Sequence, residues 1–257
     1  MLSALIIKPL NPVWWAFLFL AVVISIILWA LRRNKENRNF LFGLSIFLVV
    51  YYVCYKLLLT VAPDHEFIFW NELPLHLCNL IAILTIFTSR MSDSVIGRSM
   101  KGFCFYGGIL FAILAMMMPI AEFSGIPLFS IKAIGFYGFH SLLIITAISF
   151  ATMKIYHPQL KDIPLVLALI LIFGLLAHIL NHVLRATVFS EANYFYTFGI
   201  EGNVIMDALR RLIPFEFVWI LPLALPFAAV FACMTGVYNA ITQLALHHNL
   251  HNLRSRT

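Results

Sequence analysis

Seven long apolar runs, separated by short polar segments, are the feature that most limits how this 257-residue chain can fold. Most of the runs reach the length of about 20 residues that a helix needs to cross a bilayer. Hydrophobic residues make up 62% of the chain and charged residues only 11%, more apolar surface than a water-soluble core can bury. The sequence therefore predicts an all-α polytopic membrane protein, with residues 1–257 forming one transmembrane helical-bundle domain.

The seven runs are interpreted as helices from their length and continuous hydrophobicity. The third is short and interrupted by polar residues, as helices that line a cavity often are. The seventh contains Pro222 and Pro226, which should kink it. The predicted spans are residues 13–31, 40–61, 73–88, 103–120, 134–153, 163–183 and 215–238.

The charges of the loops predict the orientation. The loops after the first, third and fifth spans are basic, whereas the loop after the second span contains acidic residues and no lysine or arginine. Basic loops stay in the cytoplasm, so the N-terminus is expected outside and the C-terminus inside. The net charge of +6 belongs to such loops, and no nucleic-acid partner is expected. The expected location is the cell membrane, or an endomembrane in a eukaryote.

Polar and reactive side chains interrupt three of the apolar spans. Ionisable groups are costly in hydrocarbon, so such residues indicate a functional site. At about 1.5 Å per helical residue, each is expected within roughly 10 Å of the outer end of its span, so all would share one leaflet. These residues are His76 and Cys78 in the third span, His140 in the fifth, and His178, Asn181 and His182 in the sixth.

Cys78 is a candidate nucleophile and His140 is its candidate base. A thiol buried in apolar surroundings is inert unless a neighbouring group favours the thiolate, so the nucleophile requires the histidine. Gly135 and Gly138 would let another helix pack closely beside His140. The residue types alone leave two alternatives open: Cys78 as a small packing residue, and His140 hydrogen-bonded to a neighbouring helix.

His178, Asn181, His182 and Arg185 recur at helical spacing and therefore line one face of the sixth span. Two histidines four residues apart form a workable metal-binding pair, for which His140 or Cys78 could supply a third ligand. The same face could instead meet interfacial water, with Arg185 holding a lipid phosphate.

The segment LPLHLCNL, residues 73–80, resembles the signature of the YwaF-like integral membrane family, which includes the animal transmembrane protein 164. The GFHSLLII stretch around His140 and the run from LNHVL through NYFYTFG to MDALRRLIPFEFVWI support the resemblance. The chain departs from the family at Asn79, where relatives often have arginine, and at Phe215–Glu216, where they often have a Pro-Trp element. The resemblance implies an acyltransferase that moves fatty acyl chains onto ether-type lysophospholipids, with its cysteine and histidine at Cys78 and His140.

The leading hypothesis is a phospholipid acyltransferase or lipid hydrolase that works through an acyl-cysteine at Cys78, with His140 as base. Its partners would be a phospholipid acyl donor and a lysophospholipid acceptor, and no cofactor is expected. A zinc-dependent hydrolase using His140, His178 and His182, and a non-enzymatic transporter or lipid-binding protein, remain alternatives. The candidates for substrate binding or oxyanion stabilisation are His76, Asn79, His178, Asn181, His182, Arg185, Asn193, Tyr194 and Asp207.

Overall fold

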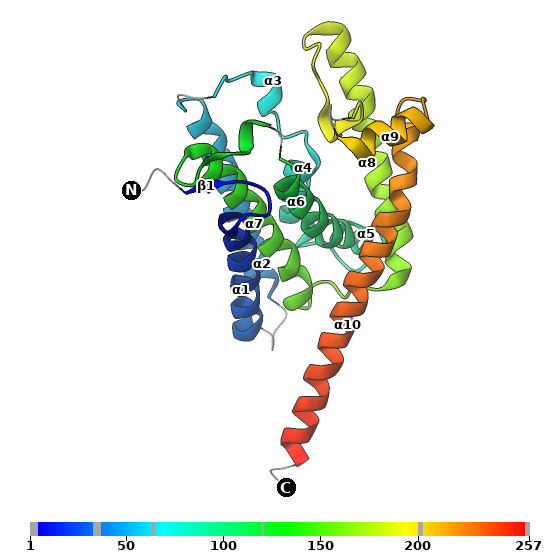
Figure 1. Cartoon of the computed structure of the whole chain (residues 1–257). Helices are drawn as coiled ribbons and strands as arrows, with labels where there is room; N and C mark the ends of the chain where they lie inside the picture. Colours follow the sequence, from blue (N-terminus) through cyan, green and yellow to red (C-terminus); the bar gives the residue numbers. More distant parts are fainter. Residues whose placement is uncertain (1–4, 33–36, 63–64, 120, 200–202, 255–257) are drawn as a thin grey trace.

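The computed structural model describes residues 5–32, 37–62, 65–119, 121–199 and 203–254, and within these ranges it is mostly helical (Figure 1). Two short strands, β1 (Ile6–Ile7) and β2 (Ile126–Pro127), pair antiparallel. The α-helices are α1 (Pro12–Arg32), α2 (Arg38–Leu59), α3 (Phe69–Glu72), α4 (Leu77–Thr88), α5 (Val95–Gly102), α6 (Gly108–Met117), α7 (Ile131–Thr152), α8 (Ile163–Thr187), α9 (Val204–Leu212) and α10 (Ala224–Arg254). Short helical turns are η2 (Phe103–Gly107), η3 (Ala121–Phe123), η4 (Leu160–Asp162), η5 (Tyr194–Tyr196) and η6 (Val218–Leu223).

Six helical stretches within the described residues are long and apolar enough to cross a membrane. One of them is composite, because the π-helical turn η2 joins α5 and α6 into a single stretch. Large apolar side chains such as Phe19 on α1 and Leu225 on α10 point away from the protein. The predicted all-α polytopic membrane fold is confirmed. The stretches are Pro12–Leu31, Arg38–Leu59, Val95–Met117, Ile131–Thr152, Leu160–Thr187 and Val218–Ala245.

The third predicted span is a shorter helix than the sequence suggested. Its helix, α4, begins at Leu77 instead of Leu73 and has 12 residues, a length of about 18 Å at 1.5 Å per residue. Leu73 has an extended backbone because the ring of Pro74 disfavours a helical residue before it. His76 is also extended and serves as the N-cap of α4. Cys78 is therefore the second residue of α4, and its side chain is half-buried against the core.

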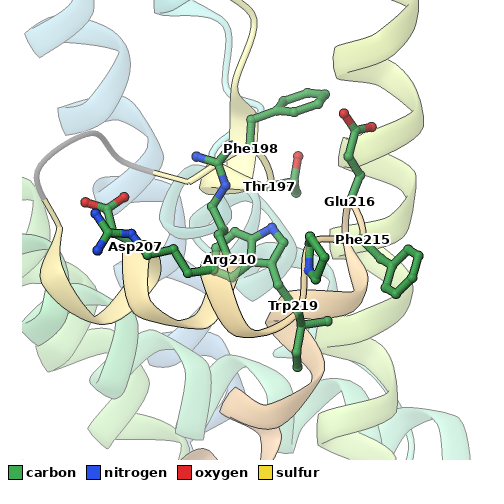
Figure 2. Close-up of a pocket in the computed structure, with 10 residues that line it drawn as sticks. Thr197, Phe198, Asp207, Arg210, Phe215, Glu216 and Trp219 are labelled. Carbon is green, nitrogen blue, oxygen red and sulfur yellow. The ribbon is translucent and has the colours of Figure 1, made fainter.

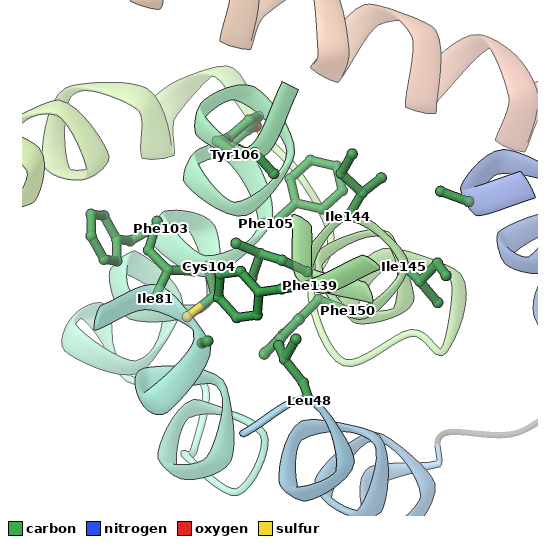
Figure 3. Close-up of a cluster of buried hydrophobic side chains, with 14 of the residues drawn as sticks. Leu48, Ile81, Phe103, Cys104, Phe105, Tyr106, Phe139, Ile144, Ile145 and Phe150 are labelled. Atoms are coloured by element: carbon green, nitrogen blue, oxygen red, sulfur yellow. The ribbon is translucent and has the colours of Figure 1, made fainter. Parts of the chain in front are cut away.

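Helix α7 lies at the centre of the bundle and packs against α1, α2 and α6. The core around it consists of aromatic and aliphatic side chains from most of the long helices, among them Leu48, Ile81, Phe105 and Phe150 (Figure 3). Tyr106 of η2 adds a hydrogen bond to Thr235 of α10, with the two oxygens 2.6 Å apart. Helices α8 and α10 form the side of the molecule opposite α1, and the second half of α10 extends beyond the other helices (Figure 1).

The two prolines of the seventh predicted span lie where the chain changes helix type. Pro222 lies within the 3-10 turn η6, and Pro226 lies in the first turn of α10. A proline is tolerated in the first turn because the N–H that it lacks would have no intrahelical partner there. The helical part of this span therefore begins at Val218 as a 3-10 turn and not at Phe215.

Candidate functional site

Cys78 lies in the first turn of α4, where the backbone favours a negative charge. Leu77 is the first helical residue and His76 is the N-cap, whose side chain makes no capping hydrogen bond. The first N–H groups of a helix have no intrahelical acceptor, and the helix dipole adds a partial positive charge at this end. Cys78 is half-buried against the main core, and the neighbouring Asn79 is buried. The N–H groups at this helix start can therefore hydrogen-bond an oxyanion beside Cys78, whereas burial favours the neutral thiol, so that a base must remove its proton.

The aromatic rings of η5 cover this end of α4. The His76 ring lies 5.4 Å from the Tyr194 ring and 5.3 Å from the Tyr196 ring, centroid to centroid. Burial, together with the nearby Cys78, raises the pKa of Tyr196 to about 12, so Tyr196 stays a neutral phenol. The sequence did not identify Tyr196 as a site residue. Its only signal is its place in the aromatic segment NYFYTFG.

His140 lies in the half of α7 nearest this site, and its tautomer follows from its hydrogen bond. The ring is buried between those of Phe136 and Phe139, and its Nδ1 lies 2.8 Å from the carbonyl oxygen of Phe136. A carbonyl oxygen only accepts, so Nδ1 carries the hydrogen and Nε2 keeps a lone pair. Nε2 is therefore the atom of His140 that can take a proton.

Cys78 and His140 occupy helices that contact each other, α4 and α7. Tyr52 of α2 links the two sides, because its ring packs 5.1 Å from that of Phe139 and its hydroxyl donates to the backbone carbonyl of Glu72. Among the described residues, no hydrogen bond joins the Cys78 sulfur to the His140 ring. Direct proton transfer between the two side chains therefore requires a closer approach than this conformation has.

Asn181 fixes the position of η5 over α4. It is fully buried, donates to the carbonyl of Tyr194 at 2.9 Å and accepts from the Tyr194 N–H at 2.9 Å. It also donates to the Thr197 hydroxyl at 2.9 Å, and the Tyr194 hydroxyl donates to the carbonyl of Trp70. The polar face predicted for residues 178–185 thus includes a residue that holds the site together.

Two residues of η5, Phe195 and Tyr196, have positive φ angles of 58° and 53°. Aromatic residues rarely adopt this left-handed region, and strained backbone of this kind occurs most often at functional sites. Phe217, at the start of η6, has a φ of 63°. All three lie in the segments that cover the histidines of α4 and α8.

His178 and His182 face each other at the end of α8 and meet Glu216. Their Nε2 atoms lie 3.3 Å apart, and Glu216 Oε2 lies 3.0 Å from His182 Nε2 and 3.9 Å from His178 Nε2. The sequence offered His140 or Cys78 as a third ligand for this pair; in the structure Glu216 is the acidic residue that meets it, and His140 bonds through Nδ1 to the Phe136 carbonyl on α7. The sequence did not identify Glu216 as a site residue. The only indication in the sequence is that this acidic residue stands just before the last apolar run.

A cavity of about 520 Å³ adjoins this group, between α9 and the segment that leads into η6 (Figure 2). Its lining includes the acids Asp207 and Glu216 and the bases Arg210 and Arg211. Asp207 was a predicted site residue, and the structure places it in this lining. The cavity can therefore accommodate a ligand that carries charged groups.

Arg185 and Asn193 make contacts within the loop that follows α8. The Arg185 guanidinium donates to the carbonyl of Ala192 at 2.7 Å and lies 4.1 Å from the centre of the Phe198 ring. Asn193 donates to the carbonyl of Gly199 at 2.7 Å and accepts from the Phe198 N–H at 3.0 Å. In this conformation both side chains shape the loop around the site.

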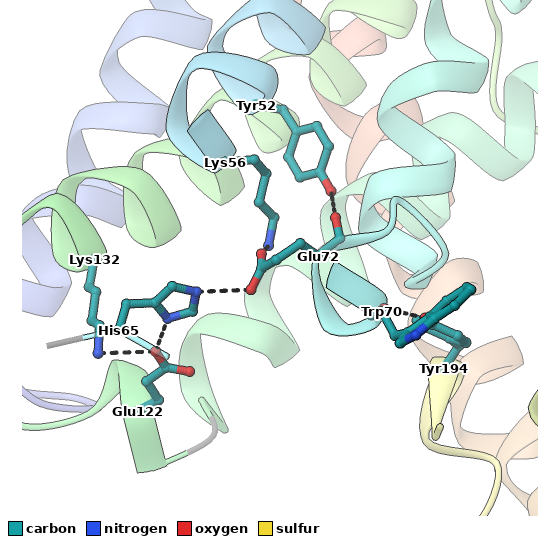
Figure 4. Close-up of polar contacts among 8 residues, drawn as sticks. All are labelled: Tyr52, Lys56, His65, Trp70, Glu72, Glu122, Lys132 and Tyr194. Atoms are coloured by element: carbon teal, nitrogen blue, oxygen red, sulfur yellow. Dashed lines mark hydrogen bonds and ion pairs between the residues drawn. The ribbon is translucent and has the colours of Figure 1, made fainter. Parts of the chain in front are cut away.

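A network of charged residues lies beside the site, where α2, α3 and η3 meet (Figure 4). His65 bridges two carboxylates, with Nδ1 2.5 Å from Glu122 and Nε2 3.0 Å from Glu72. Lys56 pairs with Glu72, and Lys132 lies 3.0 Å from Glu122. The sequence did not predict this network, because its members come from segments up to 76 residues apart.

A family model described as the TMEM164 family matches residues 7–237. No curated protein and no solved structure matches the chain. The matched range includes Cys78, His140, the polar face of α8 and the cavity.

Proposed function

The chain belongs to the TMEM164 family, and on this premise we propose that it is a membrane phospholipid acyltransferase or lipid hydrolase acting through Cys78. The observation that carries the proposal is the place of Cys78 in the first turn of α4, beside N–H groups that have no intrahelical acceptor. This arrangement supplies a nucleophile and a binding site for the oxyanion of an acyl-transfer intermediate.

In the proposed first step, the Cys78 sulfur attacks the ester carbonyl carbon of a phospholipid. His140 Nε2 takes the thiol proton, and the tetrahedral oxyanion accepts hydrogen bonds from the N–H groups at the start of α4, with the Asn79 side chain as a further candidate donor. Collapse of the intermediate breaks the ester C–O bond. The lysophospholipid leaves with the proton from His140, and the acyl group remains on Cys78 as a thioester.

In the second step, the hydroxyl of a lysophospholipid or a water molecule attacks the thioester. His140 Nε2 removes the proton of the attacking oxygen and returns it to the Cys78 sulfur as the C–S bond breaks. The products are an acylated phospholipid or a free fatty acid. Because this conformation has no Cys78–His140 hydrogen bond, the mechanism requires lipid binding to bring the two side chains together.

The test is acyl exchange by the purified protein in phospholipid vesicles containing a labelled acyl donor and an ether lysophospholipid acceptor. We expect labelled product and a hydroxylamine-sensitive acyl label on the protein. Cys78→Ser should lower the rate at least about 100-fold, as loss of an activated nucleophile does. The matched control is Cys54→Ser, since Cys54 is exposed on α2 and should tolerate the change.

His140→Gln should lower the rate by about 10²-fold or more, the usual contribution of a general base. The proportion of labelled fatty acid to labelled phospholipid separates hydrolysis from transfer. Full activity in Cys78→Ser, or an active enzyme that never carries a thioester, would show that Cys78 is not the acyl carrier. A purified protein that produces neither labelled product would contradict the proposal as a whole.

A further inference from the structure

We propose that His178, His182 and Glu216 bind one divalent metal ion of the zinc class, at a site separate from Cys78. The three donor atoms are two imidazole Nε2 atoms and one carboxylate oxygen, and they all lie within 4.8 Å of one another. Two histidines and one glutamate are a known ligand set of catalytic zinc sites. The inference does not depend on the proposed acyl transfer.

The triangle of donor atoms has the size that a zinc ion requires. Its sides are 3.0, 3.3 and 3.9 Å, so a point about 2.0 Å from all three atoms exists, at the usual zinc–ligand distance of about 2.0–2.2 Å. Adjacent ligands of a tetrahedral zinc ion lie about 3.3 Å apart at such bond lengths. An ion therefore fits between these atoms with little movement of the side chains.

The surroundings of His178 hold its ring in the orientation that a ligand needs. Its Nδ1 lies 3.1 Å from the hydroxyl of Thr197, and the rings of Phe198 and Phe217 lie 5.0 and 5.4 Å from it. When Nδ1–H donates to Thr197, Nε2 presents its lone pair to the ion. Metal-binding histidines usually donate their second ring N–H in this way, and Asn181 in turn donates to the same hydroxyl.

The remaining coordination position is open to a ligand. The side chains of His182 and Glu216 are 51% and 63% exposed, so the ion would have protein ligands on one side only. Glu216 also lines the 520 Å³ cavity, where the two bases Arg210 and Arg211 lie beside one further acid, Asp207. Positive charge beside an open metal position favours an anionic oxygen ligand, so we assign a phosphate group as the ligand class.

The test measures bound metal in the protein purified with a histidine-free affinity tag, without chelators, and reloaded with Zn²⁺ after dialysis. We expect one zinc per chain by elemental analysis, and Co²⁺ substitution should give the intense visible absorption of a tetrahedral site. His182→Ala and Glu216→Gln should remove this binding. His157→Ala is the matched control, because His157 is an exposed histidine that bonds to Tyr238 far from the site.

Thr197→Val removes the hydroxyl that accepts from His178 Nδ1–H and should weaken zinc binding about 10- to 100-fold while the three ligands remain. Cys78→Ser should keep full zinc binding, which separates this site from the acyl-transfer proposal. Zinc binding that survives in His182→Ala and Glu216→Gln, or that is lost in Cys78→Ser, would place the ion elsewhere and overturn the inference. Wild-type protein that binds less than a tenth of an equivalent of Zn²⁺ or Co²⁺ would overturn it as well. Melting midpoints of the variants without metal, equal to that of the wild type, would show that lost binding reflects lost ligands.

Discussion

The imidazole ring of His65 lies between two acidic side chains. Glu72 faces one ring nitrogen of His65 and Glu122 faces the other. His65 therefore joins α3 to η3, with Lys56 and Lys132 on either side. This residue-level arrangement connects the segment before α4, the helix of Cys78, to the segment before α7, the helix of His140.

The pKa of Glu122 gives this bridge a testable pH dependence. Burial would raise the pKa, but the hydrogen bonds from His65 and Lys132 outweigh it and hold the pKa below its ordinary value of 4.5. Because the pKa of Glu122 is lowered in the fold, its ionised form stabilises the fold at pH values above the ordinary pKa. This stabilisation is lost as the pH falls below about 4.5. We expect the melting midpoint in detergent to fall between pH 7 and pH 3.5, and to fall less in Glu122→Gln. Glu191→Gln, at an exposed carboxylate, is the control that should keep the full fall; an unchanged pH dependence in Glu122→Gln would contradict the role of the bridge.

At the scale of helices, the sequence identified the elements better than their ends. Continuous hydrophobicity located the long helices. A continuous apolar run meets lipid, and in lipid its backbone N–H and C=O groups must bond to each other, which a helix achieves. The start of α4 was misplaced by four residues, since Leu73 to His76 are apolar enough to look like helix although Pro74 disfavours it. Glu216 was missed because it meets His182 only where the segment before η6 folds back against α8. Helical spacing predicts contacts within one helix, whereas contacts between helices depend on packing angles that hydropathy does not encode.

Gly135 lies where α2 and α7 pack closely, as the sequence suggested. A Cβ on Gly135 would overlap the ring of Tyr55, so α2 and α7 pack in contact only because this residue has no side chain. Gly135→Ala should therefore separate the helices and lower stability by about 1–3 kcal/mol, the usual cost of overpacking. The measurement is the thermal melting midpoint in detergent. Gly43→Ala on α2 is the control, because a Cβ there meets no atom within 4 Å; equal midpoints for both variants would show that the contact is not tight.

At the scale of the whole molecule, the site lies at one end of the bundle. The start of α4, the end of α8 and the cavity meet through the rings of Tyr194 and Tyr196 and the amide of Asn181. Phospholipid ester bonds and phosphates lie near the bilayer surface, so a site at one end of the helices can reach the lipids of one leaflet only. For the proposed acyl transfer, the direction in which the bundle is inserted therefore decides which leaflet supplies the lipids.

The basic loops predict that the site faces the outer leaflet. Arg90 and Arg98 follow α4, and Lys154 and Lys161 follow α7, all at the end opposite Cys78, and positive residues remain in the cytoplasm. A green fluorescent protein fused after Thr257 should therefore fluoresce in bacterial cells, and alkaline phosphatase fused after Glu191 should be active. At Ser92, in the loop between α4 and α5, a green fluorescent protein fusion should fluoresce and an alkaline phosphatase fusion should be inactive. The reverse pattern would place Cys78 and His182 at the cytoplasmic leaflet, and both the acyl donor and any zinc would then come from inside the cell.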